Sequence, residues 1–268
     1  LESSPRALPD EDEEVSGELA KALQKQGIGL VTGVKVQSAA RIGKSGPAVR
    51  IVFSDAAGEV HRLDAEALLV SIGRVPNTQD AGLAGTKIEP DNGFIKVDEY
   101  MRSQEPGVYA AGDVVAGSPM LAHVGQMEAI VAVRHAAGAE TEPVNYRQSP
   151  RCVYCQPEVA SVGLTEAQAC EAGYKVRTGK FPFSANSRAA ILGERQGFVK
   201  IVSDERYGEI LGVHMIGPRV SEAIAEAVVA MRLEATAEDL ARAMHPHPAL
   251  SEALLEAAHA AGGKAIHI

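Results

Sequence analysis

Two prolines near the C-terminus constrain the backbone more than any other feature of this sequence. They lie in residues 244–252, which read Met-His-Pro-His-Pro-Ala-Leu-Ser-Glu. Each proline disfavours the helical conformation of the residue before it, so His245 and His247 are expected to be extended. Pro248 can occupy the first position of a helix, where its missing N–H costs little. We therefore expect a helix over residues 249–261, ended by a pair of glycines.

This arrangement places His247 at a helix entrance, with Glu252 little more than one turn further in. A carboxylate within reach of an imidazole fixes its tautomer and stabilises its protonated form, as a general acid/base requires. The alternative is a histidine that only caps the helix, and residue types alone favour that alternative.

Composition limits the class of protein. A chain of 268 residues with 46% hydrophobic content can bury a substantial core in one or two domains. The net charge of −9 argues against nucleic acid or an anionic membrane as the main partner. No apolar run approaches the roughly 20 residues that span a bilayer. Three cysteines do not make a disulfide framework, so we expect a reducing cytoplasm.

The N-terminal residues 1–15 are acidic and poor in apolar side chains, unlike a secretory signal. The first residue is leucine, and the first methionine is Met101. We therefore expect this chain to be a piece of a longer protein.

The first quarter of the chain has the pattern of a nucleotide-binding domain. Residues 10–26 predict an amphipathic helix, 49–63 a hairpin, and the apolar run 67–72 a strand buried on both faces. This order could be the second half of a doubly wound domain. An acidic residue after the second strand of such a domain commonly binds an NAD ribose, and Glu2 is placed for that role. Taken alone, Glu2 is more commonly a solvated surface acid.

The next segment begins with residues 73–77, which are typical of a crossing between domains. A hairpin is expected over 88–97, around an Asn-Gly turn. Residues 107–114 predict a short apolar strand, and a helix follows over about 120–137.

The strand at 107–114 ends in Gly112-Asp113. Gly112 allows close approach of a ligand, and Asp113 can accept hydrogen bonds from sugar-like hydroxyls. The N-terminus of the following helix suits an electron-rich ring that becomes anionic on reduction. The alternative is an ordinary Gly-Asp turn.

From residue 145 the pattern changes to strands followed by helices, which indicates a separate α+β domain. Thr165 and Gln168 predict a capping box. The expected strands are 152–154, 159–162, 176–181, 198–202 and 210–215, and the expected helices are 221–232, 237–244 and the terminal one. Cys152 and Cys155 are three apart in a strand and so point to opposite faces. We interpret them and Cys170 as structural, and we expect no metal site.

Several motifs together resemble the pyridine nucleotide–disulfide oxidoreductase family. They are Leu-Val-Ser-Ile-Gly-Arg-Val-Pro-Asn at 69–77, Val-Tyr-Ala-Ala-Gly-Asp at 108–113, Pro-Met-Leu-Ala-His at 119–123, Pro-Glu-Val-Ala-Ser-Val-Gly-Leu-Thr at 157–165 and Gly-Lys-Phe-Pro-Phe at 179–183. The terminal His-Pro-His-Pro with Glu252 is similar to the dihydrolipoamide dehydrogenase branch of that family.

The resemblance implies a fold of α/β plus α+β class in three parts. Residues 1–72 would be the C-terminal half of an NAD-binding domain, 73–147 the C-terminal part of an FAD-binding domain, and 148–268 an α+β interface domain for dimerisation. FAD and NAD are the implied cofactors.

The resemblance also implies roles for single residues. His247 would be the acid/base and Glu252 the carboxylate that orients it. Asp113 would bind the flavin ribitol chain. The remaining implied positions are Met120, Leu121, Ala122 and His123 at the isoalloxazine ring, and Glu2, Val36 and Gly73 at the nicotinamide nucleotide.

The implied activity is an NAD-dependent oxidation of dihydrolipoamide on a lipoyl domain, through a disulfide and FAD. The implied partners are a second copy in a homodimer and the acyltransferase core of a 2-oxoacid dehydrogenase complex, without nucleic acid or membrane. The family's glycine loops and redox-active Cys-x4-Cys precede the part present here, so we expect this chain alone to be inactive. Two alternatives stay open: a sibling flavin disulfide or quinone reductase, and a non-catalytic dimerisation or binding module.

Overall fold

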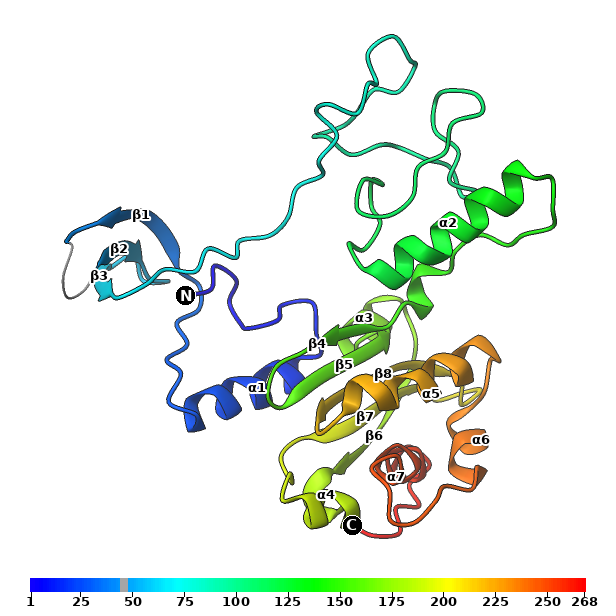
Figure 1. Ribbon diagram of the computed structural model, residues 1–268. Coiled ribbons are helices and arrows are strands. Elements are labelled where there is room, and N and C mark those ends of the chain that lie inside the picture. Colours follow the sequence, from blue (N-terminus) through cyan, green and yellow to red (C-terminus); the bar gives the residue numbers. More distant parts are fainter. Residues whose placement is uncertain (44–47) are drawn as a thin grey trace. The chain divides into compact units, whose positions relative to one another are not determined.

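The computed structural model describes residues 1–43 and 48–268 (Figure 1). The chain divides into two compact units. The first consists of Leu1–Val70 together with Pro150–Ile268, and the second is Ser71–Ser149. No helix within the described ranges is long and apolar enough to cross a membrane.

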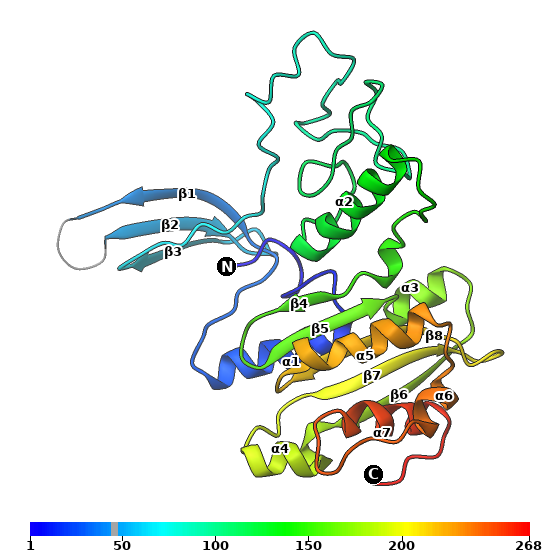
Figure 2. The ribbon, with the colours of Figure 1, turned by 45° about the vertical axis from the view of Figure 1, so that its right-hand side comes forward.

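The centre of the first unit is an antiparallel five-stranded sheet with the order β4-β5-β8-β7-β6 (Figures 1 and 2). Every residue of β7 and β8 is buried, because helices cover both faces of these strands. The expected α+β pattern of residues 145–268 is thus present. The strands are β4 (Arg151–Val153), β5 (Glu158–Gly163), β6 (Val176–Pro182), β7 (Phe198–Asp204) and β8 (Ile210–Gly217).

One face of this sheet packs against two helices, α5 (Val220–Arg232) and α7 (Glu252–Ala261). Short elements complete this part: α3 (Glu166–Glu171), η2 (Phe183–Ala185), α4 (Ser187–Leu192) and α6 (Ala237–Arg242). The capping box predicted for Thr165 and Gln168 starts α3.

The other face packs against helix α1 (Glu13–Lys25), where Val15 and Leu19 contact Phe198 and Ile216 of the sheet. Val15, Leu19 and Leu23 recur every four residues and so lie on one face of α1, in agreement with the amphipathic helix predicted over residues 10–26. The N-terminal part of the chain therefore shares a core with the C-terminal sheet.

A row of polar side chains crosses the same face of the sheet, one from each strand. Cross-strand pairing aligns the row, whose members in spatial order are Arg151, Ser161, His214, Lys200 and Lys180. Acidic residues at and just before the start of α1 form ion pairs with basic members of this row. Glu11 lies 3.1 Å from Arg151, and Glu14 lies 2.8 Å from Lys200 and also pairs with Lys180. Charge pairing and apolar packing thus fix α1 on the sheet together.

A separate sheet of three antiparallel strands contains β1 (Lys35–Arg41), β2 (Val49–Ser54) and β3 (Val60–Ala65). Strands β2 and β3 confirm the predicted hairpin. The prediction of a buried strand at 67–72 is wrong, because Leu69 is 87% and Ile72 is 93% exposed and neither is in a strand. A strand buried on both faces needs strands beside it and helices above and below. No described segment supplies them here.

The second unit contains α2 (Ala122–Ala136), as predicted, and the short helix η1 (Tyr146–Gln148). The hairpin expected over 88–97 forms only at its Asn-Gly turn, where the backbones of Asp91 and Phe94 exchange hydrogen bonds of 2.8 and 2.9 Å. The strand expected at 107–114 is wrong. Residues there form only isolated bridges, such as Asp91 with Phe94 and Arg102 with Tyr109. A strand persists only as part of a ladder, and the described residues of this unit provide none.

Candidate functional site

Helix α7 begins at Glu252, not at residue 249, and Pro248 is not its first residue. The side chain of Glu252 accounts for the later start of the helix. Its Oε2 accepts the N–H of Ala249 at 2.8 Å, so residues 249–252 close as a turn around the carboxylate before the helix starts.

The structure brings His247 and Glu252 together. Nδ1 of His247 lies 2.9 Å from Oε1 of Glu252. Burial raises the pKa of Glu252, but the Ala249 N–H and the His247 ring outweigh it, and the net pKa is below its ordinary value. The carboxylate is therefore ionised and accepts the Nδ1 proton. Nε2, on the opposite side of the His247 ring, can exchange a proton, since the side chain is 69% exposed.

His245, two residues earlier, has a different environment. Its side chain is only 5% exposed, and its Nε2 lies 2.7 Å from Oε1 of Glu226 on α5. This contact anchors the loop that carries His247. Sequence reasoning did not single out Glu226, because nothing local marks a surface acid on α5 as the partner of a histidine 19 residues away.

In the second unit, Arg74 connects two of the residues predicted to bind flavin. Its guanidinium lies 3.7 Å from Oδ2 of Asp113 and donates a hydrogen bond to the carbonyl oxygen of Met120 at 2.5 Å. The sequence placed Arg74 in a domain crossing and in a family motif, but predicted no role for it in the site. The structure shows that it links the Gly-Asp loop to the entrance of α2.

The other predicted flavin residues form that entrance. Leu121 is the N-cap of α2, Ala122 is the first helical residue, and His123 follows it. The N-cap makes no side-chain hydrogen bond to the helix, and its first turn contains no acidic residue. A helix start of this kind carries a positive partial charge that can stabilise a group that becomes anionic.

The predicted nicotinamide-nucleotide residues fall in both units. The Glu2 carboxylate accepts the N–H of Ser4 at 2.7 Å, and this bond lowers the pKa of Glu2. The Glu2 carbonyl also accepts the N–H of Val34, two residues before the exposed Val36. Gly73 belongs to the second unit and has a φ of +112°, which favours glycine. The roles of all three stay predictions.

The three cysteines are free thiols. Cys152 and Cys155 are half-buried, and burial raises the pKa of both. A raised pKa disfavours the reactive thiolate, in keeping with their interpretation as structural residues.

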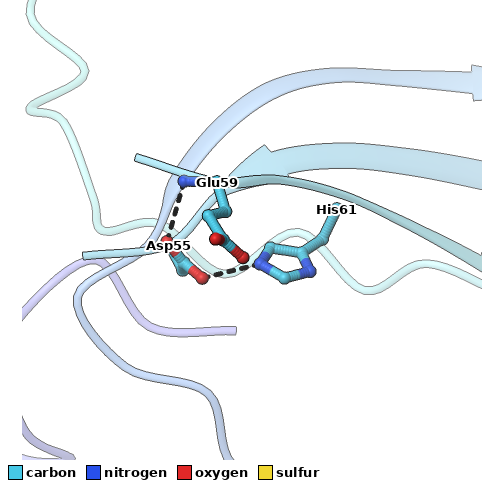
Figure 3. A group of neighbouring side chains, drawn as sticks. All are labelled: Asp55, Glu59 and His61. Atoms are coloured by element: carbon cyan, nitrogen blue, oxygen red, sulfur yellow. Dashed lines mark hydrogen bonds and ion pairs between the residues drawn. The ribbon is translucent and has the colours of Figure 1, made fainter. Parts of the chain in front are cut away.

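Figure 3 shows one cluster with possible metal ligands, formed by Asp55, Glu59 and His61. Asp55 already accepts the N–H groups of Ala57 and Glu59, and its Oδ2 lies 2.7 Å from Nε2 of His61. These bonds close the turn between β2 and β3. The cluster thus has a structural role, and no metal is assigned to it.

Comparison with protein families matches residues 1–129 to the pyridine nucleotide-disulphide oxidoreductases and residues 149–258 to the dimerisation domain of the same family. The chain belongs to the pyridine nucleotide-disulphide oxidoreductase family. The predicted fold class, α/β plus an α+β dimerisation domain, is thereby confirmed.

Curated relatives in this oxidoreductase family include the dihydrolipoyl dehydrogenase of Bacillus subtilis, 46% identical over 267 residues, and that of Mycobacterium leprae, 44% identical over 270 residues. The matches cover 100% of this chain and 56% of each relative, so the chain spans about half of their length.

Among solved oxidoreductase structures, LpdA from Mycobacterium tuberculosis superposes with a TM-score of 0.84 at 30% identity, covering 96% of this chain and 55% of LpdA. The HOCl-induced flavoprotein disulfide reductase RclA from Escherichia coli also gives 0.84, at 23% identity, covering 96% of this chain and 57% of RclA. The likeness to RclA shows a shared fold.

Proposed function

We propose that this chain is part of an NAD-dependent dihydrolipoyl dehydrogenase. The whole enzyme would oxidise dihydrolipoamide on a lipoyl domain to lipoamide and pass the electrons through a disulfide and FAD to NAD+. The hydrogen-bonded pair of His247 and Glu252 carries the proposal, because it is an assembled acid/base group. A relative that matches the whole chain at 46% identity is named dihydrolipoyl dehydrogenase.

In this mechanism His247 accepts a proton at Nε2 from a dihydrolipoamide thiol, because a thiolate and not a thiol is the nucleophile. Glu252 keeps the opposite nitrogen protonated and stabilises the resulting imidazolium. The ring returns the proton when the reaction runs in reverse. FAD, when bound, would carry the electron pair onward to NAD+.

Residues of the second unit fit a flavin. Asp113 offers an exposed carboxylate to the ribitol hydroxyls. Met120, Leu121, Ala122 and His123 would place the positive end of α2 at the ring, since they form the start of that helix. In the first unit, Glu2 would accept hydrogen bonds from the NAD ribose. Val36 of the same unit would line the nucleotide, Gly73 of the second unit is the third position implied for it, and the acidic Glu2 disfavours a 2′-phosphate.

A homodimer is part of the proposal. Residues 149–258 match the family's dimerisation domain, and His247 is mostly exposed in the single chain, as suits a side chain that serves a site completed by a second copy. We further propose docking on the acyltransferase core of a 2-oxoacid dehydrogenase complex. We also propose a reducing cytoplasm as the location, because all three cysteines are free thiols.

The first test is the visible spectrum of the purified chain, with an NADH–lipoamide assay on the same sample. We expect no turnover from the chain alone. Fusing it to the part of the Bacillus subtilis enzyme that it does not cover should give turnover. H247Q in this fusion should reduce lipoamide turnover by roughly 10²- to 10⁴-fold. An unaffected H247Q fusion would rule out the assigned acid/base.

The second candidate is a non-catalytic dimerisation module. The central strands of the five-stranded sheet are fully buried, whereas the apolar stretch 67–72 is exposed. This difference favours the module, because the dimerisation domain has its own packed core, whereas the apolar run of the nucleotide-binding part is not packed into one. A stable dimer without flavin, together with an inactive fusion, would support the module. A fusion that reduces another disulfide or a quinone but not lipoamide would indicate a sibling reductase.

A further inference from the structure

Glu128 of α2 is a buried acid that none of the roles above uses. Its side chain is 0% exposed. Its Oε2 accepts the backbone N–H of Gly112 at 2.7 Å, and its Oε1 accepts the hydroxyl of Tyr146 at 2.7 Å. Glutamate is almost never fully buried unless it is paired. Here each carboxylate oxygen accepts one hydrogen bond, so the orientation of the Glu128 carboxylate is fixed.

The backbone that Glu128 binds is the Gly-Asp loop. Gly112 has a φ of +81°, a conformation that favours glycine, and Asp113 follows it directly. Gly125, one turn before Glu128 on α2, contacts the same loop, and a Cβ there would lie 2.9 Å from the Cα of Gly112. Helix α2 therefore meets the loop by close backbone contact and by a charge-assisted hydrogen bond.

Tyr146 supplies the second donor from the start of η1. Burial, and then the neighbouring Glu128, raise the pKa of the Tyr146 hydroxyl. The hydroxyl therefore stays protonated at neutral pH and remains a donor. In the sequence, η1 directly precedes the dimerisation domain, so Glu128 joins the loop to that segment.

We propose that Glu128 is a positioning residue, which fixes the Gly112 backbone so that Asp113 is held beside the entrance of α2. Tyr146 holds the carboxylate in its single orientation. The consequence for flavin binding rests on the function proposed above. The positioning of the loop does not, since it concerns only residues of this chain.

Three variants of the 268-residue chain test this role: E128M, E128Q and Y146F. Amide hydrogen exchange at Gly112, followed by NMR, reports the loop, and quenching of FAD fluorescence reports flavin affinity. In E128M, which keeps side-chain length but has no acceptor, we expect exchange at Gly112 to accelerate about tenfold or more. FAD affinity should fall with it, while amides in the centre of β7 keep their protection.

E128Q is the matched control, because its amide oxygen can accept from Gly112 and its NH2 can donate to Tyr146. It should retain slow exchange, but the Gly112 proton resonance should move upfield, since a neutral oxygen is a weaker acceptor than a carboxylate. Y146F should accelerate exchange at Gly112 less than E128M does, because only the orienting bond is lost.

Unchanged exchange at Gly112 in E128M would overturn the proposal. If E128M does not fold, an unshifted Gly112 resonance in E128Q, with unchanged exchange in Y146F, would overturn it equally. A wild-type chain that binds no FAD would contradict the proposed flavin half-site in this chain. Exchange at Gly112 would still decide the role of Glu128, so the two failures are distinguishable.

Discussion

Nζ of Lys200 lies 3.1 Å from Oδ2 of Asp12, 188 residues away in the sequence, and both side chains are almost fully buried. Glu14 and Glu166 approach the same ammonium group at 2.8 and 2.7 Å. Burial lowers the pKa of Lys200, but these carboxylates outweigh it and the net pKa is raised. One buried lysine of β7 thereby binds the start of α1 and of α3.

Replacing Lys200 by methionine should lower the free energy of unfolding by about 3–5 kcal/mol, because the buried Asp12 carboxylate then has no counter-ion among the described residues and keeps only the hydrogen bond from the Glu14 N–H. Urea denaturation followed by circular dichroism measures the loss. K21M is the control, since Lys21 is exposed and, within the described part of the chain, forms an ion pair with Glu18 alone; it should change stability by less than about 1 kcal/mol. Equal effects of the two substitutions would contradict a special role for Lys200.

The buried His214 should make the protein sensitive to mild acid. Burial lowers the pKa of His214 below its ordinary 6.5, so below that pH the unfolded chain binds a proton that the folded chain does not. The free energy of unfolding should fall by up to about 1.4 kcal/mol per pH unit below pH 6.5. Denaturation of wild type and H214Q at several pH values tests this, and the variant should show a flatter profile.

The carboxylates of Glu252 and Glu256 affect stability over a lower pH range than His214 does. Glu252 and Glu256 have pKa values below the ordinary 4.5, so their contribution is present above that value and is lost as pH falls below it. A loss between pH 6.5 and 5 that persists in H214Q would show that His214 is not its source.

Removing the His247 ring should raise the pKa of Glu252, because the carboxylate then loses a hydrogen bond and a nearby positive charge. Carboxyl ¹³C NMR of H247Q through a pH titration measures this. H245Q is the matched control, since His245 pairs with Glu226 and not with Glu252. A Glu252 titration that does not move in H247Q would mean that the two side chains do not interact in solution.

Gly179 allows β6 to pack against α7, the helix that presents Glu252. A Cβ at this position would lie 2.1 Å from the Ala257 carbonyl oxygen and 2.2 Å from the Ala261 nitrogen. G179A should therefore cost roughly 1–3 kcal/mol or more, measured by urea denaturation.

Gly17 provides the contrast, because it lies in α1 with open space around its Cα. G17A should stabilise the protein by roughly 0.5–1 kcal/mol, through helix propensity. A G179A variant as stable as wild type would show that α7 shifts without cost.

Local signals predicted well where an element is specified by its own residues. The apolar stripe of α1, the hairpin of β2 and β3, and the capping box at Thr165 all appear as expected. The strands expected at 67–72 and 107–114 do not, because their patterns describe burial between partners and the described chain holds no such partners. Partners distant in sequence, such as Arg74 for Asp113 or Glu226 for His245, left no local signal.

By itself, the sequence determined the family motifs, the order of the five strands in residues 145–268 and of the helices after them, and the spacing that lets Glu252 reach His247. It did not predict α4 between β6 and β7. Tertiary structure decided which ionisable groups are buried and what they pair with: Lys200 with the acids of α1, Glu128 with Gly112 and Tyr146. The physical reason is the distance along the chain over which each kind of interaction acts. Backbone propensity and capping act within a few residues, whereas burial and charge pairing depend on segments that only the fold brings together.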